Sequence, residues 1–547
     1  MKFIQKIHLF IIQKSYIQFL LVFVFLFSIF SLVYISFPFV TSGDDHFFHI
    51  RFAEHMRDVG VIDAFKDFKA LYFTKHVQLN EYFIYYNFLF YIVLIPFTYL
   101  SPLFLGIKFY GVFSATCAFL LLYFCFKKLN IKYAFLWLIM ILGVFNHLLI
   151  YRFFFARPYT LAPALLILCL LLAHKNKHKL LCVFSFLYVF WHSATFYFPL
   201  LIVFLYSFFC KVYKKRWNNK IVGYSTAGVF LAILSIYLIP SNFFYLMYDI
   251  FFKIFSETIL GNSVNIPEGI EVYRKDFLTF LGQNQVPIFL WIISVTYFVQ
   301  KSLRIFKDNV IETLQNKEKN NLIFQSSLFF LSATFFSASF LLSGRFEDFS
   351  FFFMAFFIVI IWDEIISSGI CAKPTKKVFM TSVIVLSTLF FSSNSLSLYS
   401  SFATATNPLT FSNVGRWINN NVPKHSVIFF SNWSWFPQLY YYAPGYRFVT
   451  GIEPRFLYDY NPELYWEWRH ISVDGYVCKT EICDENIITK LSHVQGEEIA
   501  KAIVDHFESR VILITKKDIS LKKILDSSKY FELVYQDNDL FFIYKIK

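Results

Sequence analysis

The stretch GDDHFFHIRFAEHMRD, from Gly43 to Asp58, decides how this chain is organised. It follows the first long apolar run, residues 17–39, and places Asp44 and Asp45 side by side where that run should leave a bilayer. Carboxylates at a membrane edge are costly to place and usually serve a function. The alternative is that one of them only caps a following helix. We favour a function, because a single aspartate would suffice as a cap.

The residues after the two aspartates have the pattern of an amphipathic helix. Phe48, Phe52, Met56 and Val59 recur at helical spacing, and most polar residues fall between them. This pattern predicts a short helix that lies on the membrane surface, with the carboxylates at its N-terminal end.

The composition is that of a multi-spanning membrane protein. Of 547 residues, 57% are hydrophobic and only 16% are charged, and the chain contains 76 Phe and 35 Tyr. Long apolar runs recur, so we expect a mostly α fold, a polytopic membrane helix bundle. The first run is longer than a signal-peptide core and no small-residue cleavage site follows it, which indicates a retained span.

About eleven apolar runs approach the roughly 20 residues that a helix needs to cross a bilayer. They are residues 17–39, 105–126, 133–151, 159–173, 180–194, 195–211, 221–240, 285–303, 322–343, 350–366 and 378–394. The loops between them that are rich in Lys and Arg fall on one side if residues 82–100 lie in the interface without crossing. The opposite, outer side then receives residues 40–106, 152–159, 241–284 and 344–348.

The charge balance and the length of the apolar runs change at about Leu396. The tail carries 16 Lys and Arg against 17 Asp and Glu, whereas the preceding part carries 34 against 19. Short β-like runs at 426–430, 447–449, 510–515, 531–535 and 540–546 alternate with helical patterns at 462–470, 496–507 and 521–527. We therefore expect a transmembrane domain, residues 1–395, and an extracytoplasmic α/β domain, residues 396–547. Outside the cytosol, Cys478 and Cys483 would be able to form a disulfide.

The array DHFFHIR contains the first group of candidate site residues. Asp45 at the mouth of a membrane cavity would be able to deprotonate an acceptor hydroxyl or amine as a general base. His49 and Arg51 follow it as candidate substrate-binding residues. Carboxylate and imidazole ligands suit Mn²⁺ or Mg²⁺, so a divalent cation stays open. The alternative is that the histidines are only interfacial residues.

Two further outer loops contribute charged candidates. Arg152 and Arg157 flank three phenylalanines in RFFFARPY, and a guanidinium recognises phosphate through its planar fork of donors. The alternative is that both side chains reach lipid head groups. Arg345, Glu347 and Asp348 lie between two very aromatic runs, where they form either a local salt bridge or part of a pocket wall.

These residues resemble a known class of enzymes. An acid, an aromatic residue, His and Arg in a first outer loop, here Asp45, Phe48, His49 and Arg51, resemble the catalytic subunit of oligosaccharyltransferases. The pair 43–44 is similar to the first-loop acid of aminoarabinose and mannosyl transferases that use lipid phosphates. Both groups belong to the GT-C class of integral-membrane glycosyltransferases, whose layout of spans and C-terminal domain this chain also resembles.

The resemblance implies a sugar donor linked to a polyprenyl phosphate and inversion by direct displacement. Asp45, or else Asp44, would activate the acceptor, and Arg157 or Arg345 would hold the leaving phosphate. The sequence departs from oligosaccharyltransferases in two places. The stretch Asn432–Trp435 lacks the Asp of their Trp-Trp-Asp motif, and residues 152–159 lack their second-loop carboxylates. We therefore expect an acceptor other than an Asn sequon.

The expected partners are the lipid-linked donor, a glycan, lipid or protein acceptor, and membrane lipids, with no nucleic acid. The expected location is a bacterial inner or plasma membrane, crossed many times, with the C-terminal domain outside the cytoplasm. Alternative functions are a lipid or polysaccharide transporter or flippase, a polysaccharide polymerase or ligase of another membrane class, and a non-catalytic scaffold. A transporter would require ionisable residues near the bilayer midplane, whereas most charges here fall at the ends of the runs.

Overall fold

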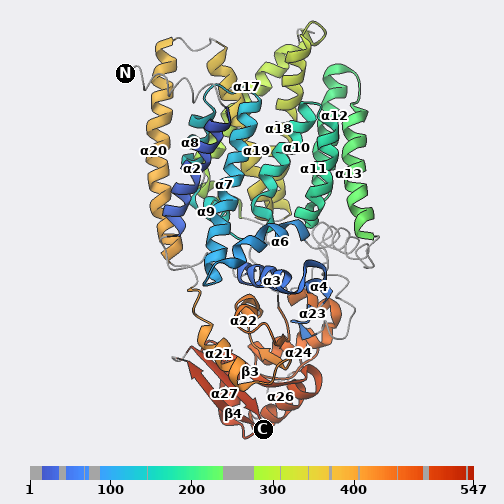
Figure 1. Cartoon of the computed structure of the whole chain (residues 1–547), viewed down its shortest axis with the longest axis vertical. Coiled ribbons are helices and arrows are strands. Elements are labelled where there is room, and N and C mark those ends of the chain that lie inside the picture. The colour runs from blue at the N-terminus through green and yellow to red at the C-terminus, as the bar shows by residue number, and fades with distance from the viewer. Residues whose placement is uncertain are drawn as a thin grey trace.

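The computed structural model describes residues 15–35, 45–66, 68–72, 87–144, 146–237, 276–307, 310–342, 344–368, 373–403, 407–451, 454–484, 492–537 and 540–547. Helices stand side by side in a bundle at one end of the molecule, and a small α/β domain lies at the other end (Figure 1). The bundle contains α2 (Ser15–Tyr34), α7 (Phe104–Lys128), α8 (Ala134–Val144), α9 (His147–Arg152), α10 (Ala162–His174), α11 (His178–Trp191), α12 (Phe198–Lys214), α13 (Asn219–Tyr237), α16 (Phe277–Gln283), α17 (Gln285–Lys307), α18 (Asn316–Leu341), α19 (Glu347–Ser367) and α20 (Lys373–Ala403). The expected mostly α bundle is confirmed.

The bundle contains six helical segments that are long and apolar enough to cross a bilayer. They are Tyr16–Tyr34, Phe104–Lys128, Ser193–Lys214, Gln285–Lys307, Asn316–Leu341 and Gly344–Ser367. These segments make the chain a multi-pass membrane protein. Shorter apolar helices occupy three other expected runs, as α8, α10 and α11. The count of about eleven crossings stays a prediction.

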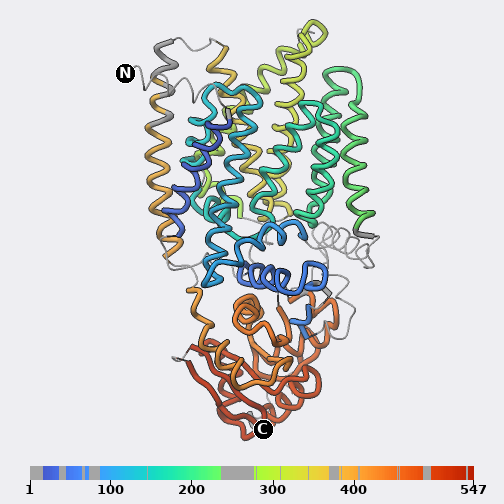
Figure 2. The backbone as a smooth tube through the Cα atoms, in the orientation of Figure 1, coloured from blue at the N-terminus to red at the C-terminus, as the bar shows by residue number. Residues whose placement is uncertain are grey.

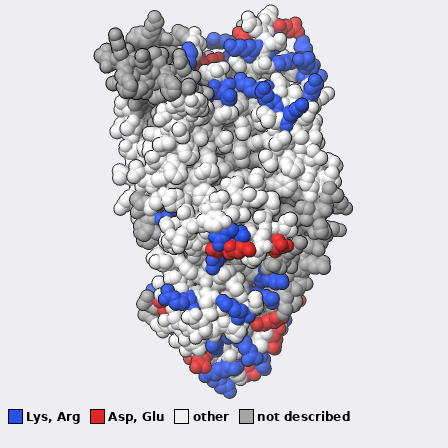
Figure 3. Space-filling view, in the orientation of Figure 1, with Lys and Arg blue, Asp and Glu red and all other residues white. Residues whose placement is uncertain are grey.

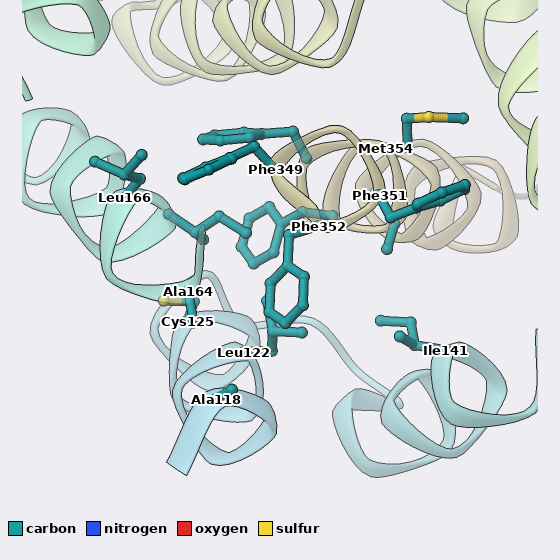
Figure 4. Close-up of a cluster of buried hydrophobic side chains, with 14 of the residues drawn as sticks. Ala118, Leu122, Cys125, Ile141, Ala164, Leu166, Phe349, Phe351, Phe352 and Met354 are labelled. Atoms are coloured by element: carbon teal, nitrogen blue, oxygen red, sulfur yellow. The ribbon is translucent and has the colours of Figure 1, made fainter. Parts of the chain in front are cut away.

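α19 lies in the core of the bundle. Its sequence is apolar on nearly all sides after the first turn, which is typical of a helix surrounded by other helices. In Figure 4, Phe352 of α19 lies among side chains from α7 and α10. The Phe352 ring centre is 4.9 Å from that of Phe153, in the loop after α9, and 5.9 Å from that of Phe119 on α7. This packing holds the start of α19 and the loop after α9 against the same helix.

The first-loop helix α3 (Asp45–Val59) is covered by protein on two faces. It lies crosswise between the bundle and the C-terminal domain, as the backbone tube shows (Figure 2). Phe48 packs against Phe436 and Tyr440 of the C-terminal domain, while Phe52 packs against Tyr91 beside the bundle. The predicted helix is present, and its apolar residues cover two faces that are both buried against protein. Its place on the membrane surface stays a prediction.

The rest of the first outer loop also docks on both neighbours. α4 (Val61–Lys66) follows α3, and α6 (Phe88–Leu94) with the 3₁₀ helix η2 (Ile95–Tyr99) lies at the end of the bundle. Between them, Leu71 pairs with Phe448 of the C-terminal sheet, and the Tyr72 hydroxyl donates to the His506 carbonyl over 2.8 Å. The expectation that residues 82–100 do not cross the bilayer stays a prediction, since residues 82–86 lie outside the described part.

The C-terminal domain contains a five-stranded mixed sheet in the order β2-β1-β3-β5-β4. Its strands are β1 (Val427–Phe430), β2 (Arg447–Phe448), β3 (Ser509–Thr515), β4 (Phe531–Asp537) and β5 (Phe541–Ile546). β1 pairs in parallel with β2 and β3, whereas β5 pairs antiparallel with β3 and β4. Its helices are α21 (Ser412–Asn421), α22 (Phe436–Tyr442), α23 (Pro454–Tyr460), α24 (Pro462–Val473), α26 (Ser492–Phe507) and α27 (Ile519–Ser527). All five expected strands and all three expected helices of the tail are present.

Two expected features of the outer side have different outcomes. Cys478 and Cys483 are joined in a disulfide, which is the pairing that the sequence allowed. Residues 238–275, which include most of the long third outer loop, lie outside the described residues, and so does Asp44.

The charges are distributed as the positive-inside pattern predicts. Figure 3 shows Lys and Arg gathered at the end of the bundle that lies away from the C-terminal domain, above a belt with very few charges. Lys127 and Lys128 end α7, Lys211 and Lys214 lie in the last turn of α12, and α17 ends at Lys307. The belt with few charges fits the hydrocarbon region of a bilayer.

Substitution of two glycines tests how closely the second outer loop packs on α7. A methyl group added at Gly111 would overlap the carbonyl oxygen of Phe154, whereas one added at Gly223 on α13 would meet nothing within 4 Å. We expect Gly111→Ala to lower the melting temperature of the detergent-solubilised protein. Gly223→Ala should keep or raise it, because Ala favours a helix over Gly by about 1 kcal/mol. Equal melting temperatures for the two variants would contradict this packing.

Candidate active site

The backbone of the second outer loop fixes the position of Arg157. α9 ends at Arg152, and a 3₁₀ helix, η3 (Pro158–Thr160), precedes α10. Arg157 is extended, with φ −136° and ψ 149°, as expected for a residue directly before proline. Thr160 donates its hydroxyl to the Arg157 carbonyl over 2.9 Å, and the Trp191 indole donates to the Pro158 carbonyl over 2.8 Å. These bonds fix the backbone that carries Arg157.

Asp45 and Arg157 form an ion pair between the first and second outer loops. Asp45 is the first residue of α3, where a carboxylate also favours the positive end of the helix dipole. Its Oδ2 lies 2.8 Å from Arg157 Nη2, and the Asp45 side chain keeps 40% of its surface exposed against 13% for Arg157. Asp45 is therefore more than a cap: its carboxylate contacts a fixed cation and is still accessible to a ligand.

A second ion pair lies next to the first. Arg152 Nη2 is 2.9 Å from Asp348 Oδ2, and both side chains are largely buried. Both guanidiniums lie near the Tyr159 ring, whose centre is 5.6 Å from Arg152 Cζ and 5.8 Å from Arg157 Cζ. The site thus brings three separate loops together around one aromatic ring.

His49 lies on the same side of α3 as Asp45, one turn further along. Its Nδ1 is 2.9 Å from the Tyr91 hydroxyl, and its ring packs against that of Phe90. Burial, and then the positive charge of Arg157, lower the pKa of His49 to about 3 from its ordinary value of 6.5. His49 is therefore neutral at physiological pH and does not act there as a cation for a phosphate.

The charged residues of the fourth outer loop, residues 344–348, lie in two places, some at the candidate site and one at the surface. Asp348 pairs with Arg152 across the bundle, rather than in a salt bridge within its own loop. Glu347 is buried beside it in the first turn of α19, whereas Arg345 is exposed and lies within electrostatic range of His192.

Arg51 lies on a different face of α3 from Asp45. Arg51 follows Asp45 by six residue steps of 100° each, which places it about 120° away from Asp45 around the helix axis. Arg51 pairs with Glu54 and lines a cleft of about 570 Å³ between α3 and the C-terminal domain. We call this space the α3 cleft; its polar lining consists mainly of Arg51, Glu54, Asp58, Lys69, His425 and Arg447. The structure therefore separates Arg51 from the Asp45–Arg157 pair.

Three residues near the candidate site were not identified from the sequence. Tyr91 and Tyr159 carry no distinguishing pattern in a chain with 35 tyrosines. Lys108 is different, because it is a charged residue inside an apolar run. It is buried on α7, with Nζ 5.5 Å from the centre of the Tyr34 ring, and its position within the second expected span was a usable signal.

The described residues do not fit a divalent cation at Asp45. Among them, the one group of three or more His, Cys, Asp and Glu side chains close enough to share a metal ion is His470, Cys478 and Cys483. Those two cysteines are disulfide-bonded and do not offer the thiolates that a metal requires. The Asp45 and Asp348 carboxylates each contact a guanidinium instead. We assign no step to a cation.

The lowered pKa of His49 predicts how stability depends on pH. The unfolded chain regains a His49 pKa near 6.5, so it binds a proton below that pH that the folded chain does not bind. Stability should therefore fall as the pH drops from 6.5 towards 3, by about 2 kcal/mol between pH 7 and pH 5. His49→Gln should remove this part of the loss, as thermal unfolding at both pH values would measure. His425→Asn, at an exposed histidine, is the matched control, and equal pH dependence of wild type and His49→Gln would contradict the prediction.

Comparison with known proteins finds similarity in structure and not in sequence. Neither protein-family profiles nor curated protein sequences give a match. An oligosaccharyltransferase of Archaeoglobus fulgidus without ligand is 11% identical, and the alignment covers 91% of this chain and 70% of that one with a TM-score of 0.59. The same enzyme tethered to an acceptor peptide with an NVT sequon is 11% identical over 98% of this chain and 74% of that one, with a TM-score of 0.57.

A second group of solved structures matches almost the full length of both chains. ArnT of Cupriavidus metallidurans bound to undecaprenyl phosphate is 9% identical, over 95% of this chain and 97% of that one, with a TM-score of 0.54. Both groups are GT-C glycosyltransferases. The bundle, the crosswise first-loop helix and the C-terminal α/β domain of this chain therefore form the fold of the GT-C class of integral-membrane glycosyltransferases.

Proposed function

We propose that this chain is a glycosyltransferase that moves a sugar from a polyprenyl-phosphate-linked donor to an acceptor on the outer side of the membrane. The observation that carries the proposal is the Asp45–Arg157 ion pair, which puts a carboxylate and a guanidinium together at the end of the bundle. The GT-C fold supports it, since ArnT, with the same fold, has been solved with undecaprenyl phosphate.

In the proposed reaction, Asp45 is the general base. An acceptor hydroxyl or amine attacks the anomeric carbon of the donor while its proton passes to the Asp45 carboxylate. The bond from the anomeric carbon to the phosphate oxygen breaks, and its electron pair stays on that oxygen. The configuration inverts because attack and departure take place on opposite faces of the sugar. The partial exposure of Asp45 supports this role, because an acceptor must be able to reach it.

Arg157 stabilises the phosphate that leaves. It exchanges its contact with Asp45 for the phosphate oxygens, whose negative charge grows as the glycosidic bond breaks. Arg152 also lies near the Tyr159 ring and adds a second positive charge, while the buried Asp348 fixes its orientation. Arg345 is a weaker candidate for the phosphate, because it is exposed beside His192 instead of next to Asp45.

His49 and Glu347 are positioning residues in this proposal. Neutral His49 joins α3 to α6 through Tyr91 and so sets the direction in which the first turn of α3 points. Glu347 supports the first turn of α19 beside Asp348. Asp44 remains a candidate for the base, although it lies outside the described residues.

We also propose the sidedness and the domain division. Residues 1–395 form the transferase domain, and residues 396–547 form an extracytoplasmic domain that closes over α3. The basic end of the bundle and the Cys478–Cys483 disulfide support this orientation, because disulfides persist in oxidising compartments.

Substitution of Asp45 tests the proposal. Membranes that contain the chain are given tritiated sugars linked to undecaprenyl phosphate together with an extract of cell-envelope acceptors, and label transferred to the acceptors is counted. Asp45→Asn should lower the rate by about 10²–10⁴-fold, because a general base contributes that much. Arg157→Gln should also lower it, and Arg157→Lys should restore part of the loss.

The control separates loss of chemistry from loss of fold. Asp505→Asn removes a carboxylate from the exposed face of α26 and should transfer sugar at the wild-type rate. The melting temperature of Asp45→Asn should stay close to that of the wild type. A folded Asp45→Asn variant with full activity would falsify the assignment of Asp45 as the base.

A further inference from the structure

The α3 cleft is a hollow of defined lining that the proposed reaction does not use. Its volume of about 570 Å³ lies within the range of roughly 300–1,000 Å³ that is typical of small-molecule sites. One wall is α3, and the other wall is the edge of the C-terminal sheet at β2 together with residues 68–70. The cleft therefore lies where three segments of the chain that are separate in the sequence meet.

The walls of the cleft are fixed by backbone hydrogen bonds. The Phe448 amide donates to the Ala70 carbonyl over 2.8 Å, which attaches the first outer loop to the sheet edge. The Arg447 amide donates to the Ser426 carbonyl over 3.0 Å, and the His425 amide donates to the Gly445 carbonyl over 2.9 Å. The backbone that carries the lining side chains is thus fixed before any ligand binds.

The charges in the cleft are not balanced. Glu54 already contacts Arg51 and Arg57, and Asp58 contacts Arg57 over 2.8 Å. Among the described residues, no carboxylate pairs with Lys69 or Arg447. The Arg447 Nε is buried and has no hydrogen-bond acceptor within the described part of the chain. The Arg447 side chain as a whole is half-buried and lines the cleft, so an anion in the cleft would be bound favourably through charge-assisted hydrogen bonds to its guanidinium.

The α3 cleft is distinct from the Asp45–Arg157 site. On the helical wheel, Glu54 and Asp58 lie about 180° and 220° from Asp45, so the cleft opens on the other side of α3. The bundle side of the helix carries Asp45 and His49, and the C-terminal-domain side carries the cleft. A ligand in the cleft would therefore contact neither Arg157 nor Arg152.

We propose that the α3 cleft binds an anion of sugar size, that is, a saccharide or a glycerol head group that carries a phosphate or a carboxylate. Arg447 would bind the anionic group through its fork of donors, and Lys69 would add a second positive charge at the exposed edge. The shared chemistry fits a soluble sugar phosphate or a phospholipid head group. This inference goes beyond the proposed transfer reaction and does not depend on it.

Calorimetric titration of the purified full chain tests this site. In phosphatidylcholine nanodiscs the wild type should bind glucose 1-phosphate, and unphosphorylated glucose should bind at least tenfold more weakly. Arg447→Gln should weaken the binding of glucose 1-phosphate by about 10–100-fold, the usual effect of losing a hydrogen bond to a charged group. Lys69→Gln should weaken it less, and because Lys69 is exposed, this variant should fold even where Arg447→Gln does not.

Three controls make the result specific. Lys517→Gln removes one exposed positive charge from the same domain outside the cleft and should leave the affinity unchanged. Arg157→Gln should keep the part of the glucose 1-phosphate binding that Arg447→Gln weakens, which separates this site from the proposed reaction. Nanodiscs that contain phosphatidylglycerol should compete with glucose 1-phosphate if the occupant is a lipid head group, and should not compete if it is soluble.

Two results would overturn the proposal. One is the absence of glucose 1-phosphate binding by the wild type in phosphatidylcholine nanodiscs. The other is binding that survives both Arg447→Gln and Lys69→Gln but is lost in Arg157→Gln, because the sugar phosphate would then occupy the Asp45–Arg157 site.

Discussion

The ion pair between Asp45 and Arg157 is the constraint on which the rest of the structure depends. The Asp45 carboxylate and the Arg157 guanidinium are 2.8 Å apart, and both side chains are at least partly shielded from water. Charges with reduced hydration need a fixed partner, so the elements that carry them must be held in place. α3 supplies the carboxylate and the loop between α9 and η3 supplies the cation. Contacts from α7, α11 and α19 fix that loop, and the C-terminal domain fixes α3 from the other side.

This arrangement suits a substrate that is half lipid and half sugar. The phosphate of a polyprenyl-linked donor lies at the boundary between hydrocarbon and water. Arg157 and Arg152 lie at the end of the bundle, which is the same level in the proposed orientation. In the proposed reaction the sugar extends towards the C-terminal domain, whose surface carries many charged side chains (Figure 3). Asp348 is ion-paired with Arg152, and burial keeps His49 neutral. In the proposed reaction, this fixed arrangement would stabilise the departing phosphate with little reorganisation.

The sequence predicts local structure and charge type better than contacts between distant segments. The strands at Val427–Phe430 and Ser509–Thr515 follow from short β-branched and aromatic runs, and the bundle follows from apolar runs of span length. The burial of α3 on two faces does not follow, because periodicity shows which residues avoid water but not which neighbour covers them. For the same reason Arg51 was grouped with Asp45 by spacing along the chain, although helix geometry points it elsewhere. The pairing of Arg152 with Asp348 required the fold itself.

The most direct test of the account is a cryo-electron microscopy structure of the full chain in nanodiscs with undecaprenyl phosphate. The account predicts that the phosphate lies within hydrogen-bond distance of the Arg157 guanidinium, with the Asp45 carboxylate facing the space that the donor sugar would fill. A phosphate bound on another part of the bundle, with Arg157 still contacting only Asp45, would contradict it.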